Sequence, residues 1–77
     1  MVPSGSSTRQ KFAENLRQLR EDRGLTQEEL AEKANLHRTY VGSVERGERN
    51  VTIDSMQRLA DALDVPVWSL LHPDGPE

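Results

Sequence analysis

Residues 25–50, LTQEELAEKANLHRTYVGSVERGERN, contain two short helical patterns separated by a corner of only a few residues. The first helix is expected to start after Thr26, because Thr26 and Glu29 have the spacing of a capping box. It is expected to end at Asn35, since asparagine tolerates the left-handed conformation that a reversal of the chain requires. The second pattern predicts a helix over residues 38–46. A helix, a tight corner and a second helix leave the chain few ways to fold, and the pair is expected to form a helix-turn-helix.

Three further helices are expected around this pair. Apolar residues recur at helical spacing over residues 9–23, where Ser7 or Thr8 is a suitable cap. Residues 53–63 show the same spacing, and a short helix is expected over residues 67–71. No segment alternates as a strand would, so the expected fold class is all-α with five short helices. The apolar stripe expected in the fourth helix consists of Ile53, Met56, Leu59, Ala60 and Leu63.

The length and composition fit a single domain. It is expected over residues 8–72, with a disordered leader over residues 1–7 and a short tail over residues 73–77. The absence of cysteine excludes a disulfide framework, a thiolate metal site and a cysteine nucleophile. No apolar run approaches the roughly 20 residues of a membrane-spanning helix, and no secretory signal pattern opens the chain. A cytoplasmic protein without a membrane partner is expected.

No constellation of residues indicates catalysis. The two histidines lie far apart in the sequence, and no nucleophile–base set, metal-ligating cluster or glycine-rich phosphate loop is present. We therefore expect neither an enzyme nor a bound metal, cofactor or small-molecule ligand.

Charge is unevenly distributed along the chain. The formal net charge is −3, which by itself disfavours a nucleic-acid partner. Residues 36–53, however, carry three arginines against two glutamates, whereas residues 54–77 carry one arginine against five acidic side chains. Because binding depends on the local field, the positive segment remains compatible with an anionic partner.

The predicted helix over residues 38–46 has a face suited to reading DNA. Successive residues are about 100° apart, so Val41 and Val44 face the core while arginine and hydroxyl side chains lie on the other side. Arg38 stands at the N-terminal end, where a helix-turn-helix reaches base edges. Arginine can bond O6 and N7 of guanine together, and hydroxyls can contact several base edges. The residues expected to contact bases are Arg38, Thr39, Tyr40 and Ser43.

A second group of residues is placed to hold the DNA backbone. Backbone N–H groups at the start of the helix after Thr26 suit a phosphate. Arginine and polar side chains also surround the loop that follows the second helix. The expected phosphate contacts are Gln27, Arg46, Arg49, Asn50 and Thr52.

These residues also have structural interpretations. Arg38 and Thr39 can be ordinary solvated side chains, and Tyr40 can be an aromatic residue at the rim of the core. Gly42 can either ease packing or let the helix lie deeper in a groove. Glu45 falls on the core-facing side of its helix, so it is expected to be a buried or half-buried ion-pair partner.

Trp68 leaves two interpretations open. It lies in the short C-terminal amphipathic helix, and a core this small does not obviously need it. Its ring is expected either to cover the core of the monomer or to contact a second copy of the chain. An acidic helical domain with an exposed tryptophan also fits a different function, that of an antitoxin or adaptor-type protein-interaction module.

The ordered set of motifs resembles a known family. LTQEELAEKANLHRTYVGSVERGERN is similar to the helix-turn-helix of the lambdoid phage repressors and Cro proteins, the Xre family. LADALDVPVWSLL is similar to the last two helices of that family, so the resemblance extends over about residues 9–71. HRTYVGSVERGERNVTIDSM resembles, more narrowly, the controller proteins of restriction–modification systems.

This resemblance implies five helices, a homodimer and recognition of a two-fold operator in double-stranded DNA. It implies base contacts at Arg38, Thr39 and Ser43, with Tyr40 as a further contact. It also implies phosphate contacts at Gln27 and in the loop over residues 46–52. The structural ion pair implied is Arg20 with Glu45, and the dimer interface implied includes Val67, Trp68 and Leu71. The chain departs from the family pattern at Asn35, where glycine is frequent.

Overall fold

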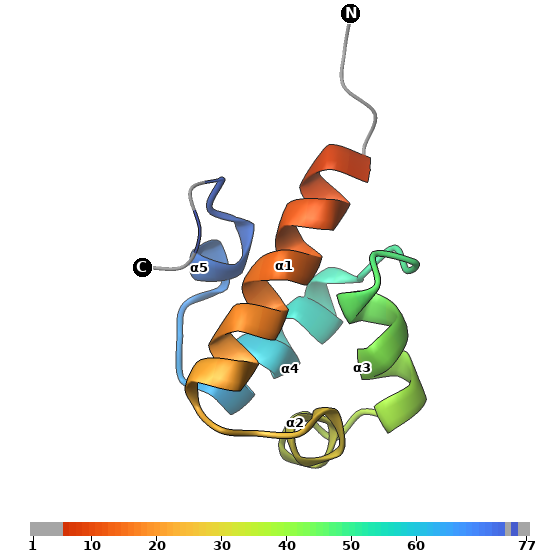
Figure 1. The fold of residues 1–77 in the computed structure, drawn as a ribbon, viewed down its shortest axis with the longest axis vertical. Helices are drawn as coiled ribbons and strands as arrows, with labels where there is room; N and C mark the ends of the chain where they lie inside the picture. The colour runs from red at the N-terminus through yellow and green to blue at the C-terminus, as the bar shows by residue number, and fades with distance from the viewer. Residues whose placement is uncertain (1–5, 74, 76–77) are drawn as a thin grey trace, which may run out of the picture.

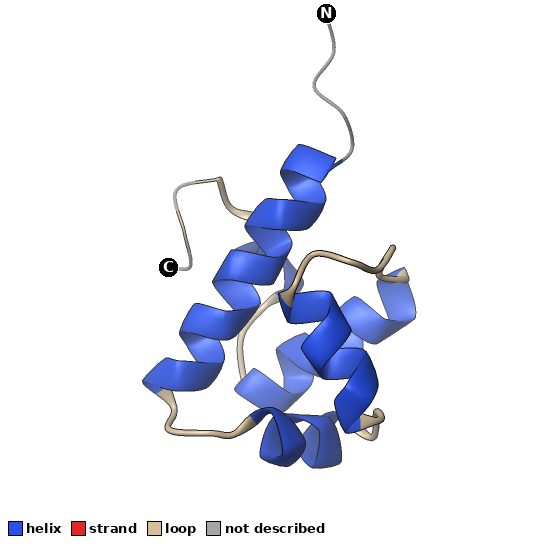
Figure 2. Cartoon of the chain, turned by 45° about the vertical axis from the view of Figure 1, so that its right-hand side comes forward, coloured by secondary structure: helices blue, strands red, loops and turns tan. Residues whose placement is uncertain are grey.

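The computed structural model describes residues 6–73 and residue 75. This part of the chain contains five α-helices and no strand (Figure 2), which confirms the all-α prediction. Residues 1–5 of the predicted leader lie outside the described residues, as do residues 74, 76 and 77 of the predicted tail. The helices are Ser6–Asp22 (α1), Gln27–Ala34 (α2), Arg38–Glu45 (α3), Ile53–Leu63 (α4) and Val67–Leu71 (α5).

The first helix starts earlier than the sequence suggested. It begins at Ser6, so positions 7 and 8, which were expected to precede the helix, lie within its first turn. At the other end, Gly24 has a φ of +68°. Backbone hydrogen bonds from the N–H groups of residues 24 and 25 close the last turn in a Schellman arrangement. Glycine adopts this left-handed conformation without the steric cost of a Cβ, and Gly24 therefore suits the end of α1.

The helices surround one apolar core. The long α1 has α5 on one side and α3 on the other, and α2 packs against both α3 and α4 (Figure 1). Val41 and Val44 of α3 are fully buried in this core, as predicted. Complete burial of a Val, Leu or Phe side chain is worth about 1.5–3 kcal/mol, so this core holds α2 and α3 firmly against each other. The buried apolar residues are Phe12, Ala13, Leu16, Leu19, Leu30, Ala31, Ala34, Val41, Val44, Leu59, Ala60, Leu63 and Leu70.

One residue of the predicted apolar stripe in α4 was wrongly placed. Ile53 is 79% exposed. It directly follows Thr52, the N-cap of α4, whose hydroxyl oxygen accepts a hydrogen bond from the N–H of Ser55. Within α4 the apolar contact with the core begins at Met56, while Val51 packs against the core from the loop before the helix. Helical spacing cannot reveal where a core ends, and the stripe therefore continued in the prediction for one turn too many.

Candidate nucleic-acid interface

Local hydrogen bonds fix the corner between α2 and α3. Asn35 has φ 59° and ψ 45°, the left-handed conformation expected of it. The N–H of Leu36 donates to the carbonyl oxygen of Ala31 at 2.8 Å, which closes the end of α2. His37 then caps α3, because its Nδ1 accepts a hydrogen bond from the N–H of Thr39 at 3.1 Å. The two helices are thus joined without a flexible linker, and the prediction of a helix-turn-helix is confirmed.

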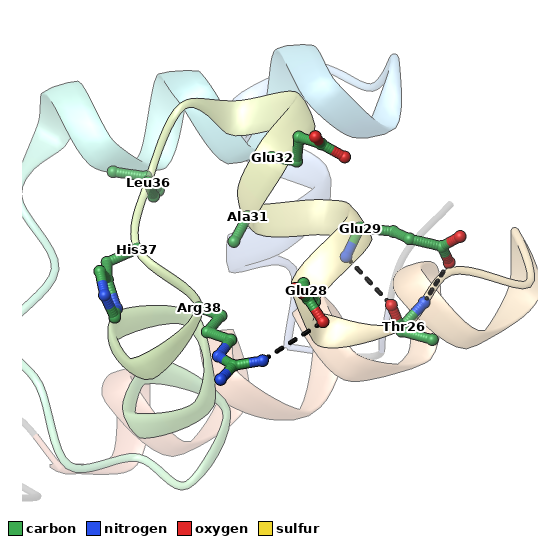
Figure 3. Close-up of a pocket in the computed structure, with 8 residues that line it drawn as sticks. All are labelled: Thr26, Glu28, Glu29, Ala31, Glu32, Leu36, His37 and Arg38. Atoms are coloured by element: carbon green, nitrogen blue, oxygen red, sulfur yellow. Dashed lines mark hydrogen bonds and ion pairs between the residues drawn. The ribbon is translucent and has the colours of Figure 1, made fainter.

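The start of α2 is fixed by the capping box. The hydroxyl oxygen of Thr26 accepts from the N–H of Glu29 at 3.0 Å, and the Glu29 carboxylate accepts from the N–H of Thr26 at 2.8 Å. Figure 3 shows both bonds at the N-terminal end of α2. This reciprocal pair satisfies two donors that would otherwise lack partners.

A buried carboxylate ties α1 and α2 to the end of α3. Glu45 has a side chain with no exposed surface, and it accepts hydrogen bonds from Arg20 Nε at 2.6 Å and Arg20 Nη2 at 3.0 Å. Gln27 Nε2 donates to the same carboxylate at 3.0 Å, and Arg17 Nε lies 3.6 Å from it. Hydrogen bonding to Glu45 raises the pKa of Arg20 above its ordinary value, although burial acts in the opposite direction. The predicted ion pair between Arg20 and Glu45 is therefore confirmed.

Gly42 leaves room for two side chains that cross over it. A Cβ built at this position would lie 3.3 Å from both Arg46 Nη1 and Gln27 Oε1. Within the monomer, the absence of a side chain at Gly42 therefore eases packing, which is one of the two interpretations given to this residue. A polar groove runs along this line between α2 and α3. Its lining residues are Arg20, Thr26, Gln27, Glu28, Arg38, Thr39, Gly42 and Arg46.

Arg38 and Thr39 lie at the exposed N-terminal end of α3. The Arg38 side chain is 66% exposed, and its Nη1 lies 3.3 Å from Oε1 of Glu28, which is itself 71% exposed. Figure 3 shows the two side chains pointing toward each other from α3 and α2. This ion pair spans the mouth of the groove, and sequence reasoning did not foresee it, because the pairing depends on the angle between the two helices.

Ser43 was predicted to lie on the open surface of α3, but it is buried. It is only 5% exposed, and its hydroxyl donates to the carbonyl oxygen of Tyr40 at 2.8 Å. The same oxygen accepts from Arg49 Nε at 3.0 Å, and the Arg49 guanidinium carbon lies 5.6 Å from the centre of the Tyr40 ring. The loop after α3 therefore folds Arg49 back over Ser43, which helical angles within α3 alone could not reveal.

Some of the predicted phosphate-contact residues already interact with other side chains of the protein. Arg46, Arg49, Asn50 and Thr52 are all exposed, whereas Gln27 is partly buried. Arg46 Nε lies 3.2 Å from the Glu48 carboxylate. Arg9 of α1 donates to the side-chain oxygen of Asn50. Arg9 thus joins this surface from a distant part of the sequence, and no signal in the sequence pointed to it.

The comparisons with known proteins agree with this geometry. The helix-turn-helix family model matches residues 16–67. The chain belongs to this helix-turn-helix family.

Among members of the helix-turn-helix family, the control protein C.SmaI of Serratia marcescens is 53% identical over 64 residues, or 83% of this chain and 76% of that protein. The crystal structure of the restriction-modification controller protein C.AhdI from Aeromonas hydrophila has a TM-score of 0.79 and 48% identity. The match covers 80% of this chain and 94% of C.AhdI. C.Esp1396I, solved as a tetramer with its natural 35 base-pair operator, has a TM-score of 0.77 and 36% identity, over 83% of this chain and 88% of its own. The predicted resemblance to controller proteins is confirmed.

The short helix α5 lies on the far side of α1 from α3 (Figure 1). Two of its apolar side chains are exposed. Trp68 is 56% exposed and Leu71 37% exposed, while Val67 is partly buried. The Trp68 ring lies 6.2 Å from that of His72. More than half of the Trp68 side chain is therefore open to solvent in the monomer, and the dimer interface at this position stays a prediction.

Two further findings concern residues 6–73 and 75. No three of their histidine, aspartate and glutamate side chains are grouped so that they could hold a metal ion. No helix among them is both long and apolar enough to span a bilayer.

Proposed function

We propose that this protein is a sequence-specific, DNA-binding transcription regulator that acts in the cytoplasm as a homodimer on a two-fold operator. The observation that supports this most directly is the exposed pair Arg38 and Thr39 at the N-terminal end of α3, beside the polar groove between α2 and α3. These are the positions from which a helix-turn-helix reaches base edges. The operator complex of the related C.Esp1396I supports the same assignment.

Arg38 bonds a guanine in the major groove through two parallel N–H donors, and Thr39 contacts a neighbouring base edge. Tyr40 is a further base contact, and Arg49 stacked on its ring restricts where its hydroxyl can reach. The Ser43 hydroxyl is covered in the free monomer, where it accepts a hydrogen bond from Arg49. Ser43 therefore contacts a base only when Arg49 moves away and the hydroxyl exchanges this bond for one to the DNA.

Phosphate groups flanking the groove are held by the start of α2 and by the loop after α3. Gln27 contributes its side chain at the positive end of the α2 dipole. Arg46, Arg49, Asn50 and Thr52 surround a second phosphate position at the end of α3. These contacts fix the register of the protein on DNA, while the base contacts supply the specificity.

Dimerisation through α5 suits the geometry of a two-fold operator. Trp68 and Leu71 are exposed residues of α5, and this helix lies on the side of α1 away from α3 (Figure 1). Two copies joined there can present their α3 helices to half-sites about 34–36 Å apart, which is one turn of B-DNA. No catalytic step, metal or cofactor is part of the proposal. The antitoxin or adaptor-type alternative is less well supported, since the relatives are control proteins and transcription regulators.

In-vitro selection of duplexes by the full chain, followed by footprinting, tests the proposal. Arg38→Ala is expected to weaken binding to the selected duplex by about 1–3 kcal/mol and to relax selectivity at one guanine position. Wild-type protein that selects no duplex at low salt, or Arg38→Ala protein with unchanged affinity and selectivity, would show that the assignment is wrong.

A further inference from the structure

We infer that Glu28 is a specificity-determining residue, which positions the guanidinium of Arg38 for a guanine and disfavours binding to other sequences. The inference rests on the proposed function and deepens it, because it concerns the same groove. Its starting point is the 3.3 Å contact between Glu28 Oε1 and Arg38 Nη1. The two side chains come from different helices and meet where α3 is expected to approach the bases.

The geometry of this pair leaves the reading edge of Arg38 available. Arginine carries five N–H donors in a planar fork, and the contact with Glu28 engages only Nη1. Nε and Nη2 lie along another edge of the same plane, with the spacing that two adjacent acceptors of guanine require. A carboxylate that holds one edge restricts rotation of the side chain, so less conformational entropy is lost when the other edge bonds a base.

The positions of Arg38 and Glu28 along their helices give a second reason why the two side chains form an ion pair. Arg38 is the first residue of α3, where the positive end of the helix dipole opposes a cation. Glu28 lies in the first turn of α2, where an anion is favoured. The carboxylate therefore offsets an unfavourable location for the guanidinium and holds it near the groove instead of letting it turn toward solvent.

The charge of Glu28 affects binding to operator DNA and binding to non-specific DNA differently. Non-specific binding depends on attraction between cationic side chains and phosphates. A carboxylate at the mouth of the groove repels every duplex, whatever its sequence. Only a duplex with guanine at the right position compensates for this repulsion, because only there does the oriented guanidinium form both bonds. Glu28 thus raises the ratio of operator affinity to non-specific affinity, while it weakens binding to DNA in general.

The test compares Glu28→Gln with wild-type protein on two duplexes, the one selected by the wild type and a scrambled duplex of the same length and composition. Glu28→Gln is expected to raise affinity for the scrambled duplex about two- to fivefold at low salt, the scale of one exposed ion pair. Affinity for the selected duplex is expected to stay the same or fall, because the lost orientation of Arg38 offsets the relief of repulsion. The ratio of the two affinities therefore falls.

Glu32→Gln is the matched control. Glu32 lies one turn further along α2 and is exposed. It takes part in none of the ion pairs found among residues 6–73 and 75, and Figure 3 shows it pointing away from Arg38. Its substitution removes the same charge from the same helix and is expected to leave the ratio unchanged. Circular dichroism on each variant checks that the fold is retained.

The Arg38→Ala background separates positioning from simple repulsion. If Glu28 acts on specificity through Arg38, Glu28→Gln in that background raises affinity for both duplexes equally and leaves their ratio unchanged. If Glu28→Gln alone left the ratio of selected to scrambled affinity unchanged or raised it, the inference would be overturned. It would also be overturned if Glu32→Gln lowered this ratio by the same amount. The same holds if Glu28→Gln lowered the ratio equally in the Arg38→Ala background. A wild-type protein without any preference for the selected duplex would instead overturn the proposed function itself.

Discussion

Arg20 binds both carboxylate oxygens of Glu45 in a two-pronged contact, with Nε 2.6 Å from Oε2 and Nη2 3.0 Å from Oε1. The contact joins the C-terminal part of α1 to the last residue of α3, 25 positions away in the sequence. Since Glu45 also accepts a hydrogen bond from Gln27, one carboxylate holds three helices together. The orientation of α3 therefore depends on a polar contact as well as on the apolar core.

Arg20→Ala is expected to destabilise the fold by about 3 kcal/mol, because it leaves the Glu45 carboxylate buried without its main partner. Urea unfolding followed by circular dichroism measures the change. Arg17→Ala is the matched control, since Arg17 lies 3.6 Å from the same carboxylate but is 52% exposed. It is expected to cost less than about 1 kcal/mol. Equal losses for the two variants would contradict the assigned role of the buried pair.

Arg20→Lys is expected to make stability more sensitive to alkaline pH. Pairing with Glu45 raises the pKa of Arg20 above its ordinary value. The stabilising contribution of Arg20 is thus complete at every pH below that ordinary value and is lost only as the pH rises through the higher folded pKa. A lysine has an ordinary pKa of about 10.4, so its contribution is lost sooner. The difference in unfolding free energy between variant and wild type should widen between about pH 9 and about pH 11.5; a constant difference would refute this.

Arg49→Ala is expected to weaken binding to selected and scrambled duplexes alike. A lost phosphate contact lowers the slope of log K against log salt by about one. Fluorescence anisotropy from about 50 to about 200 mM salt measures this slope. Arg58→Ala removes the same charge from exposed surface on α4, and it should leave the slope nearly unchanged. A loss confined to the selected duplex would instead assign Arg49 to base recognition.

Trp68→Ser is expected to weaken self-association at least about tenfold, because a large aromatic side chain at the centre of an interface commonly contributes 2 kcal/mol or more. Sedimentation equilibrium measures the dimer constant. Lys33→Ser, an exposed change on α2, serves as the control and should have no effect. Identical association of both variants would place the dimer interface elsewhere on the molecule.

Several features that depend on neighbours along the chain could be predicted from the sequence, although the start of α1 could not. The capping box at Thr26 involves residues three positions apart, and the left-handed Asn35 follows from its own conformational preference. The inward face of α3 followed from its period. These features could be predicted because local geometry determines them.

Features that depend on the angle between elements could not be predicted in the same way. Ser43 is covered because the loop after α3 returns over it, and Arg9 reaches Asn50 from a helix about 40 residues earlier. The pair between Glu28 and Arg38 requires the crossing angle of α2 and α3. Each of these contacts forms only when the helices pack together, and no periodicity or motif in the sequence predicts it.

Asn15 has a consequence for how a newly made chain matures. This buried α1 residue donates both amide hydrogens to carbonyl oxygens at the end of α5, those of Leu70 at 3.0 Å and His72 at 2.9 Å. The end of α5, the helix that carries Trp68, is thus tied to α1 by a contact between residues 55 positions apart in the sequence. The chain cannot make this contact until residues 70–72 have been synthesised, so the dimer surface proposed on α5 is complete only in a chain that has finished folding.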